Sequence, residues 1–186
     1  MFLEEIDITG KLSAGLVNMY ELVDREARKL NIDYLVVGAM ARDLVLVHGF
    51  GSKIERGTKD IDFGINVDSW AEFKDLSNAL KLIGFESDAK ISHRFTIKAE
   101  DGLPWEIDIV PFGKIAGTGN TIAWPPKEDF KMTVLGFSES LEHAINVKIC
   151  DKSNTVIKVA SPAAISILKL LAWTEREVEK RPKDAS

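Results

Sequence analysis

Two aspartates, Asp60 and Asp62, open an apolar segment that runs to Ile65, and this pair sets the first limit on the fold. The alternation of polar and apolar residues predicts a β-strand, in which side chains two positions apart point to the same side. Two carboxylates side by side repel each other unless a cation lies between them. Oxygen-only ligands suit Mg²⁺ or Mn²⁺, so we predict a site for one of these ions, with a solvated strand end as the alternative.

The segment before this pair predicts a binding site for phosphate groups. Residues 34–37 read as a short apolar strand that stops at Gly38, and a helical pattern follows from Ala39 to about position 48. Backbone N–H groups at the start of a helix bind anions, and a side chain at position 38 would obstruct their approach. We therefore predict that the amides of Gly38 and Ala39 bind phosphate.

Several cations flank this predicted phosphate site. Arg42 lies one turn into the helix and is placed to reach a phosphate, with a salt bridge to Asp43 or Glu55 as the alternative. The loop at 49–59 is basic and suits a triphosphate or an RNA end, whereas solvated charge is the simpler explanation. Lys169 lies beside the apolar face of a C-terminal helix, where it either touches the nucleotide or lies along the edge of the core.

A third carboxylate, Asp108, lies within an apolar strand pattern at 105–110. An unpaired carboxylate is costly to bury, so this residue needs a partner. On the sheet face beside Asp60 and Asp62 it would complete a two-metal site. There the metals activate a hydroxyl and steady a leaving pyrophosphate, while Asp108 helps to remove the proton. Capping of a loop or pairing with a surface lysine is the structural alternative.

Three further segments have helical patterns. Apolar spacing predicts a helix at 11–30, and a second helix begins at Ser69, where S-W-A-E fits a capping box. Ser161-Pro162 is typical of a third helix start. The predicted inner face of this last helix consists of Ile165, Leu168 and Ala172.

The remaining segments read as strands and loops. Strands are predicted at 95–98 and 105–110 across a short turn, and a loop is predicted at 111–126. Residues 131–159 look β-like again and include V-L-G-F at 134–137. Helices interleaved with strands and short turns predict an α/β or α+β fold, with a mixed sheet that is antiparallel in part.

Composition excludes several classes of protein. A net charge of −5 over 186 residues argues against a protein that coats nucleic acid with its whole surface, although a local basic patch is compatible with it. The single cysteine, Cys150, suits a reducing compartment, and neither a signal peptide nor a membrane-spanning run is visible. We expect one cytoplasmic domain over 1–186, with a core at about 33–160 and a helical segment at 161–186.

The motifs together resemble the nucleotidyltransferase superfamily, which includes DNA polymerase β, CCA-adding enzymes and aminoglycoside nucleotidyltransferases. Gly38 follows a strand, R-G-T-K-D-I-D occupies 56–62, and Asp108 lies on a later strand. The sequence is most similar to the AbiEii-type nucleotidyltransferase toxins, whose R-x-T-x-D-I-D pattern it matches. A C-terminal helix with Lys169 and a later Lys183-Asp184 pair are also similar to that group.

This resemblance implies a nucleotidyltransferase fold, with a mixed and mostly antiparallel sheet flanked by helices. It implies transfer of a nucleoside monophosphate from an NTP to an acceptor hydroxyl on an RNA or tRNA end, a protein or a small molecule. It also implies an antitoxin as a partner protein and Mg²⁺ or Mn²⁺ as the cofactor, with Asp60, Asp62 and Asp108 as catalytic metal ligands. The nucleotide-binding residues that it implies are Gly38, Ala39, Arg42, Thr58 and Lys169.

Two features depart from the family pattern, and two other functions stay open. The family has Gly-Gly or Gly-Ser where this sequence has Gly38-Ala39. The sequence stops at Ser186, so the segment that selects an acceptor is expected to be minimal or missing. The short C-terminus favours a binding module of the same fold that holds nucleotide or a partner without turnover. A carboxylate-metal nuclease fits the acids but leaves the Gly38 turn unexplained.

Overall fold

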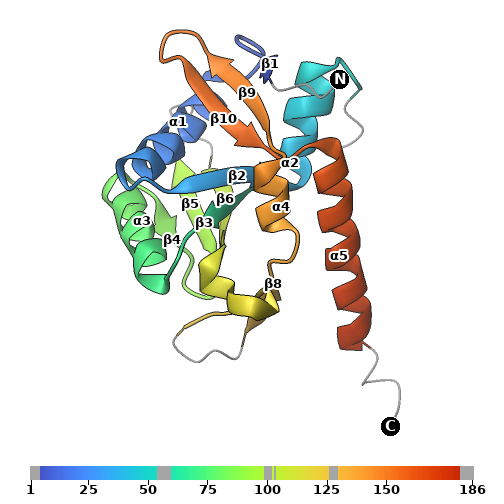
Figure 1. Ribbon diagram of the computed structural model, residues 1–186. Helices are drawn as coiled ribbons and strands as arrows, with labels where there is room; N and C mark the ends of the chain where they lie inside the picture. The colour runs from blue at the N-terminus through green and yellow to red at the C-terminus, as the bar shows by residue number, and fades with distance from the viewer. Residues whose placement is uncertain (1–4, 54–59, 99–101, 103, 126–129, 181–186) are drawn as a thin grey trace.

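The computed structural model describes residues 5–53, 60–98, 102, 104–125 and 130–180, the last six of these by backbone alone. Figure 1 shows how the elements are arranged. In chain order they are β1 (Glu5–Asp7), α1 (Ala14–Lys29), β2 (Asp33–Val37), α2 (Gly38–Arg42), a π-helical segment (Asp43–Gly49), β3 (Asp60–Asn66), α3 (Trp70–Leu82), β4 (Glu86–Ser87), β5 (Arg94–Lys98), β6 (Pro104–Phe112), a 3₁₀ segment (Lys114–Gly119), β7 (Thr121–Ala123), β8 (Lys131–Thr133), α4 (Phe137–Glu142), β9 (Ile145–Cys150), β10 (Thr155–Val159) and α5 (Pro162–Lys180).

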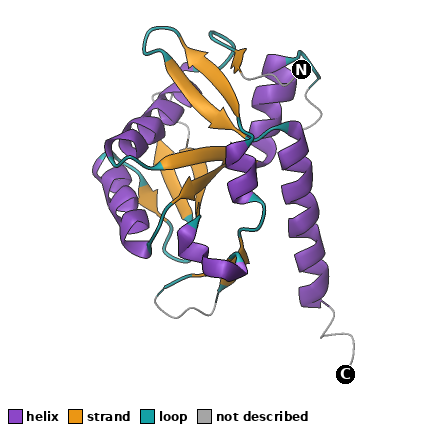
Figure 2. Cartoon of the chain, in the orientation of Figure 1, coloured by secondary structure: helices purple, strands orange, loops and turns teal. Residues whose placement is uncertain are grey.

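A mixed sheet of eight strands runs through the molecule in the order β1-β9-β10-β2-β3-β6-β5-β4. The pairs β1/β9, β10/β2 and β3/β6 are parallel, and the other four neighbouring pairs are antiparallel. β7 and β8 form a separate two-stranded antiparallel sheet. The structure therefore confirms the predicted mixed, mostly antiparallel sheet flanked by helices (Figure 2).

One face of β3 is apolar and belongs to the core. Ile61, Phe63 and Ile65 are fully buried, as the strand period of two requires for side chains on one face. The ring of Tyr20 from α1 meets Phe63 edge-on, with the ring centroids 5.9 Å apart. The predicted helix at 11–30 is confirmed in α1, where the Leu16 amide donates a hydrogen bond to the N-cap Ser13 Oγ.

The opposite face of β3 carries Asp60, Asp62 and Asn66 and is met by α4. Phe137 at the start of α4 packs against Gly64, where an added Cβ would come within 2.7 Å of the Phe137 ring. This close approach explains why β3 carries a glycine in its centre.

α5 begins as predicted, because the Ala164 amide donates a hydrogen bond to Ser161 Oγ. Ile165 and Leu168 pack against the core, but Ala172 is exposed, so its predicted place on the inner face is wrong. The physical reason is visible in Figure 1, where the C-terminal half of α5 extends beyond the sheet. Among the described residues, no helix combines the length and the apolar character needed to cross a membrane.

α3 also begins as predicted, with one difference at its cap. The Glu72 amide donates to Ser69 Oγ at 3.3 Å, as a capping box requires. The Glu72 carboxylate, however, accepts from the Asp68 amide at 2.8 Å instead of from the Ser69 amide. The cap therefore holds the residue before Ser69 as well as the first turn of the helix.

Other predicted segments differ in the structure. V-L-G-F at 134–137 is a turn followed by α4, because Gly136 adopts φ +87° and the helix starts at Phe137. The helix after Gly38 is α-helical only to Arg42 and then becomes π-helical, a geometry frequent near functional sites. The predicted loop at 111–126 is partly regular, since β6 continues to Phe112 and the 3₁₀ segment and β7 follow.

Candidate functional site

The structure brings Asp62 and Asp108 together across two neighbouring strands. β3 and β6 are parallel, and their register places Asp62 opposite Asp108 and Asp60 opposite Glu106. Side chains at paired positions of neighbouring strands project from the same face, so four acidic residues share one end of this face. The predicted convergence of Asp108 with the aspartate pair is thus present at the level of strand register. We call this the acidic end of the sheet.

Gly38 lies against the Asp62 carboxylate, at the point where β2 ends and α2 begins. Its φ is +71°, a region that favours glycine. An added Cβ would overlap Asp62 Oδ2. The sequence analysis assigned the need for glycine to phosphate approach, whereas the structure shows a second cause, the approach of the backbone to a carboxylate.

The surroundings of Asp62 disfavour the ionised form of its carboxyl group. Partial burial raises the pKa of Asp62 from its ordinary 3.8 to about 6, and repulsion from Asp108 and Asp60 adds to this effect. The positive charge of Arg94 offsets part of it. A carboxyl group with a raised pKa beside other acids is typical of a functional site.

Arg94 is the residue at this site that sequence reasoning missed. Its Nε and Nη2 donate to the two carboxylate oxygens of Asp108, each at 2.8 Å, and its Nη1 lies 3.2 Å from Glu106 Oε2. The hydrogen bonds to Asp108 hold the pKa of Arg94 above its ordinary value. Antiparallel pairing of the two predicted strands could have identified this residue, because Arg94 faces Asp108 across the β5–β6 hairpin. The predicted strand, however, began one residue later, at position 95.

The side chains at the acidic end are of the types that bind divalent metal ions. Among the described side chains, no three of the types His, Cys, Asp and Glu converge as a ready metal site. Arg94 donates to both oxygens of Asp108. The acidic end nevertheless offers oxygen ligands alone, as Mg²⁺ and Mn²⁺ prefer. Burial raises the pKa of Asp62, and repulsion from Asp108 and Asp60, which a bound cation would relieve, raises it further.

The residues predicted to bind phosphate differ in where the structure places them. Gly38 and Ala39 begin α2 as predicted. Arg42 makes the alternative salt bridge, with Nε and Nη2 at 2.8 and 2.7 Å from Asp43 Oδ1. Lys169 is exposed on α5, a helix that contacts α2. The predicted residues Arg56, Thr58 and Lys59 and the Lys183-Asp184 pair lie outside the described residues.

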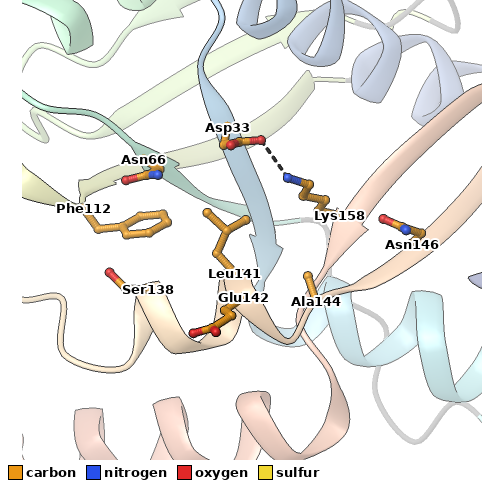
Figure 3. A pocket seen from close by; sticks show the side chains of 9 residues that line it. All are labelled: Asp33, Asn66, Phe112, Ser138, Leu141, Glu142, Ala144, Asn146 and Lys158. Atoms are coloured by element: carbon orange, nitrogen blue, oxygen red, sulfur yellow. Dashed lines mark hydrogen bonds and ion pairs between the residues drawn. The ribbon is translucent and has the colours of Figure 1, made fainter. Parts of the chain in front are cut away.

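A cavity of about 450 Å³ lies at the other end of the same strands (Figure 3). The register pairs Asp33 with Asn66 and Asn66 with Phe112, and all three line this cavity. Lys158 donates a hydrogen bond to Asp33 at 2.7 Å and so neutralises that carboxylate. The cavity end is about 13 Å along the strands from Asp62, so the hollow and the cluster of acids are separate features.

Three solved structures show weak similarity to this chain. The Thermotoga maritima CCA-adding enzyme complexed with tRNA is 20% identical, over 56% of this chain and 23% of that one, with a TM-score of 0.39. Lincomycin-bound LnuA, a lincosamide antibiotic adenylyltransferase, is 16% identical over 84% of each chain, with a TM-score of 0.47. ANT(2″)-Ia in complex with adenylyl-2″-tobramycin is 15% identical, over 92% of this chain and 81% of that one, with a TM-score of 0.49.

The family comparison is stronger. A search of curated proteins found no significant match. A family model described as nucleotidyl transferase AbiEii toxin, type IV toxin–antitoxin system, matches residues 22–185. The matched span includes the R-G-T-K-D-I-D motif at 56–62 and Asp108. This protein therefore belongs to the AbiEii nucleotidyl transferase toxin family.

Proposed function

We propose that this protein moves a nucleoside monophosphate from an NTP to an acceptor hydroxyl, with Mg²⁺ or Mn²⁺ bound at the acidic end of the sheet. The observation that carries the proposal is the register of β3 and β6, which sets Asp62 beside Asp108 at the point where Gly38 opens α2. Family membership supports the class of reaction.

The proposed reaction is an in-line displacement at the α-phosphorus. The acceptor oxygen forms a bond to this phosphorus, the bond to the β-phosphate oxygen breaks, and pyrophosphate leaves. Asp60 and Asp62 would hold the metals, and Asp108 would hold one of them and accept the hydroxyl proton. The bound metal would supply charge neutralisation on the attacking and leaving oxygens.

Other residues would bind the triphosphate. The amides of Gly38 and Ala39 would donate to the β- and γ-phosphates, as donors at a helix start do. Arg42, Thr58 and Lys169 would add polar and positive contacts, for which Arg42 must exchange its salt bridge with Asp43 for a phosphate. Arg94 would fix the carboxylate of Asp108 and balance the charge of Glu106.

The family also supports a biological setting. Membership in a type IV toxin–antitoxin family favours a toxin whose action is countered by an antitoxin partner. The acceptor would be an RNA or tRNA end, a protein or a small molecule, and a cytoplasmic location would give access to all of them.

Incubation of the protein with each of the four labelled NTPs, Mg²⁺ and either bulk RNA or cell extract tests this proposal. We expect label to move to one acceptor fraction with one or more NTPs, and EDTA to abolish the transfer. Shortening of the RNA without transfer would instead indicate a nuclease. Absence of turnover with every NTP and both acceptor pools would overturn the proposal.

One observation favours a second candidate, a nucleotide- or partner-binding module without turnover. Arg94 engages both oxygens of Asp108, so the third carboxylate is neutralised by the protein itself. In such a module Mg²⁺ and an NTP would bind without release of pyrophosphate. A pyrophosphate-release assay beside a binding measurement separates the two functions.

A further inference from the structure

Three aromatic rings lead from Asp108 to the protein surface. His93 Nε2 lies 4.0 Å from Asp108 Oδ2. The ring of Phe130 lies nearly parallel to that of His93, at an interplanar angle of 18° and a centroid distance of 6.2 Å. Trp124 packs against the same histidine, with the centroids 5.5 Å apart. The acidic end therefore continues into an aromatic cluster, which we define as His93, Trp124 and Phe130.

The inner part of this cluster is fixed by packing. Trp124 is only 5% exposed and contacts the rings of Trp70 and Phe73 at 5.2 and 5.6 Å. The Trp124 amide donates a hydrogen bond to the Phe130 carbonyl at 3.0 Å, which ties the two residues together. The position of Phe130 beside His93 is thus determined by a packed core and a backbone hydrogen bond.

Phe130 itself is 52% exposed. A single exposed apolar side chain is ordinary on a protein surface. This one differs because it continues a buried cluster that also contains unsatisfied polar atoms. His93 Nδ1 and Trp124 Nε1 are buried and have no hydrogen-bond partner among the described residues. Buried polar atoms without partners call for an explanation, and a bound polar group is one.

The ligand that suits these features is flat and aromatic and has polar edges. One exposed ring is too small to form a protein interface, which needs roughly 800 Å² on each partner. Nucleobases stack on exposed phenylalanine and histidine rings, and every base has a face suited to this contact. One histidine ring separates Phe130 from Asp108, with 6.2 Å between the Phe130 and His93 ring centroids and 4.0 Å between His93 Nε2 and Asp108 Oδ2.

We propose that Phe130, supported by His93 and Trp124, is a stacking subsite for a nucleobase beside the acidic end of the sheet. The inference rests on the proposed function, because that function brings nucleotides to Asp108. The base belongs either to the NTP or to the terminal nucleotide of an acceptor, and the two sources share the same ring chemistry.

Isothermal titration with Mg²⁺ and each of the four NTPs tests the first source, with inorganic tripolyphosphate as a probe that lacks a base. We expect Phe130→Ala to weaken NTP binding roughly tenfold, a change of about 1.4 kcal/mol that lies within the range of base stacking on an aromatic ring. Tripolyphosphate binding should be unchanged, and Phe130→Trp should bind NTP as wild type does. Leu82→Ala, at an 88% exposed leucine on α3, is the matched control and should change nothing.

The second source gives a different result. Phe130→Ala would then leave NTP affinity unchanged but weaken binding of a short oligonucleotide roughly tenfold, and an oligonucleotide with an abasic end would bind both proteins equally. Circular dichroism and the melting temperature should show that each variant is folded.

Two outcomes overturn the proposal. If wild type binds NTPs with Mg²⁺ and Phe130→Ala weakens neither NTP nor oligonucleotide binding, the subsite is wrong while the proposed function stands. If wild type binds none of the four NTPs, the proposed function fails and the subsite fails with it.

Discussion

The acidic end and the cavity end of the sheet belong to the same strands and the same face, yet their physical chemistry differs. At the acidic end, Asp62 is partly buried beside other acids, and its pKa is raised to about 6. At the cavity end, Asp33 is exposed and paired with Lys158. The cavity thus contains a paired aspartate, whereas the aspartate with the raised pKa lies at the acidic end. A raised carboxyl pKa beside other acids, rather than the presence of a cavity, is therefore the feature that identifies the acidic end as the candidate site.

The largest expected effect of a substitution is on transfer at the acidic end. Asp62→Asn preserves the shape of the side chain but removes half of the charge of the paired aspartates. We expect transfer of labelled nucleotide to fall about a thousandfold, because metal coordination contributes several kcal/mol to the transition state. Asp33→Asn at the cavity end should leave the rate within about twofold of wild type. Near-normal turnover of Asp62→Asn would place the metal site elsewhere.

A pair of glycines allows a matched comparison of the two ends. Gly38 has φ +71° beside Asp62, and Gly113 has φ +98° beside Asn66, which lines the cavity. Replacement of either by alanine combines backbone strain with a steric clash, at a cost of about 2–4 kcal/mol in unfolding free energy. Only Gly38→Ala should also abolish transfer under conditions where the protein is folded. Equal loss of transfer in Gly113→Ala would remove the distinction between the ends.

The free energy of unfolding should depend on pH because the pKa of Asp62 differs between the folded and unfolded states. Its folded-state pKa of about 6 exceeds the ordinary value of 3.8, so between these pH values the native state binds more protons than the unfolded state. Wild type therefore loses unfolding free energy as the pH rises through this window, by at most about 3 kcal/mol, and less because Asp62 is partly solvated.

Asp62→Asn removes that loss. In denaturant titrations without divalent cations, the variant should be more stable than wild type at pH 8 and nearly equal to it at pH 4. Asp33→Asn, the control at the cavity end, should show no such gain at pH 8. An Asp62→Asn advantage of the same size at pH 4 and pH 8 would argue against the assigned cause.

The smallest expected effects come from removing one cation at each end. Arg94→Ala leaves the partly buried Asp108 carboxylate without its partner, and we expect a loss of about 1–3 kcal/mol, below the range for fully buried pairs. Lys158→Ala breaks an exposed pair and should cost less than about 1 kcal/mol. Mg²⁺ should restore part of the stability of Arg94→Ala and none of that of Lys158→Ala, as measured by thermal unfolding. Equal costs for the two variants would show that the charge at the acidic end is not special.

The sequence by itself determined the local features of this protein. The alternation at 60–65 assigned Asp60 and Asp62 to one face of a strand, because side-chain direction follows from the period of two. The caps at Ser69 and Ser161 located two helix starts, since a hydroxyl that accepts a backbone N–H acts within a single turn. Side-chain direction in a strand and capping of a helix each depend only on residues that are neighbours in the sequence.

Only the tertiary structure decided which of these features meet. Asp62 and Asp108 are 46 positions apart, and their pairing depends on the register of β3 with β6, which the packing of the whole sheet sets. The capture of Asp108 by Arg94 follows from the hairpin register. The segment at 134–137 became a turn and a helix because Gly136 adopts a left-handed conformation and Phe137 packs on Gly64. Periodicity fixes the direction of a side chain, whereas only the sum of long-range contacts fixes its neighbours.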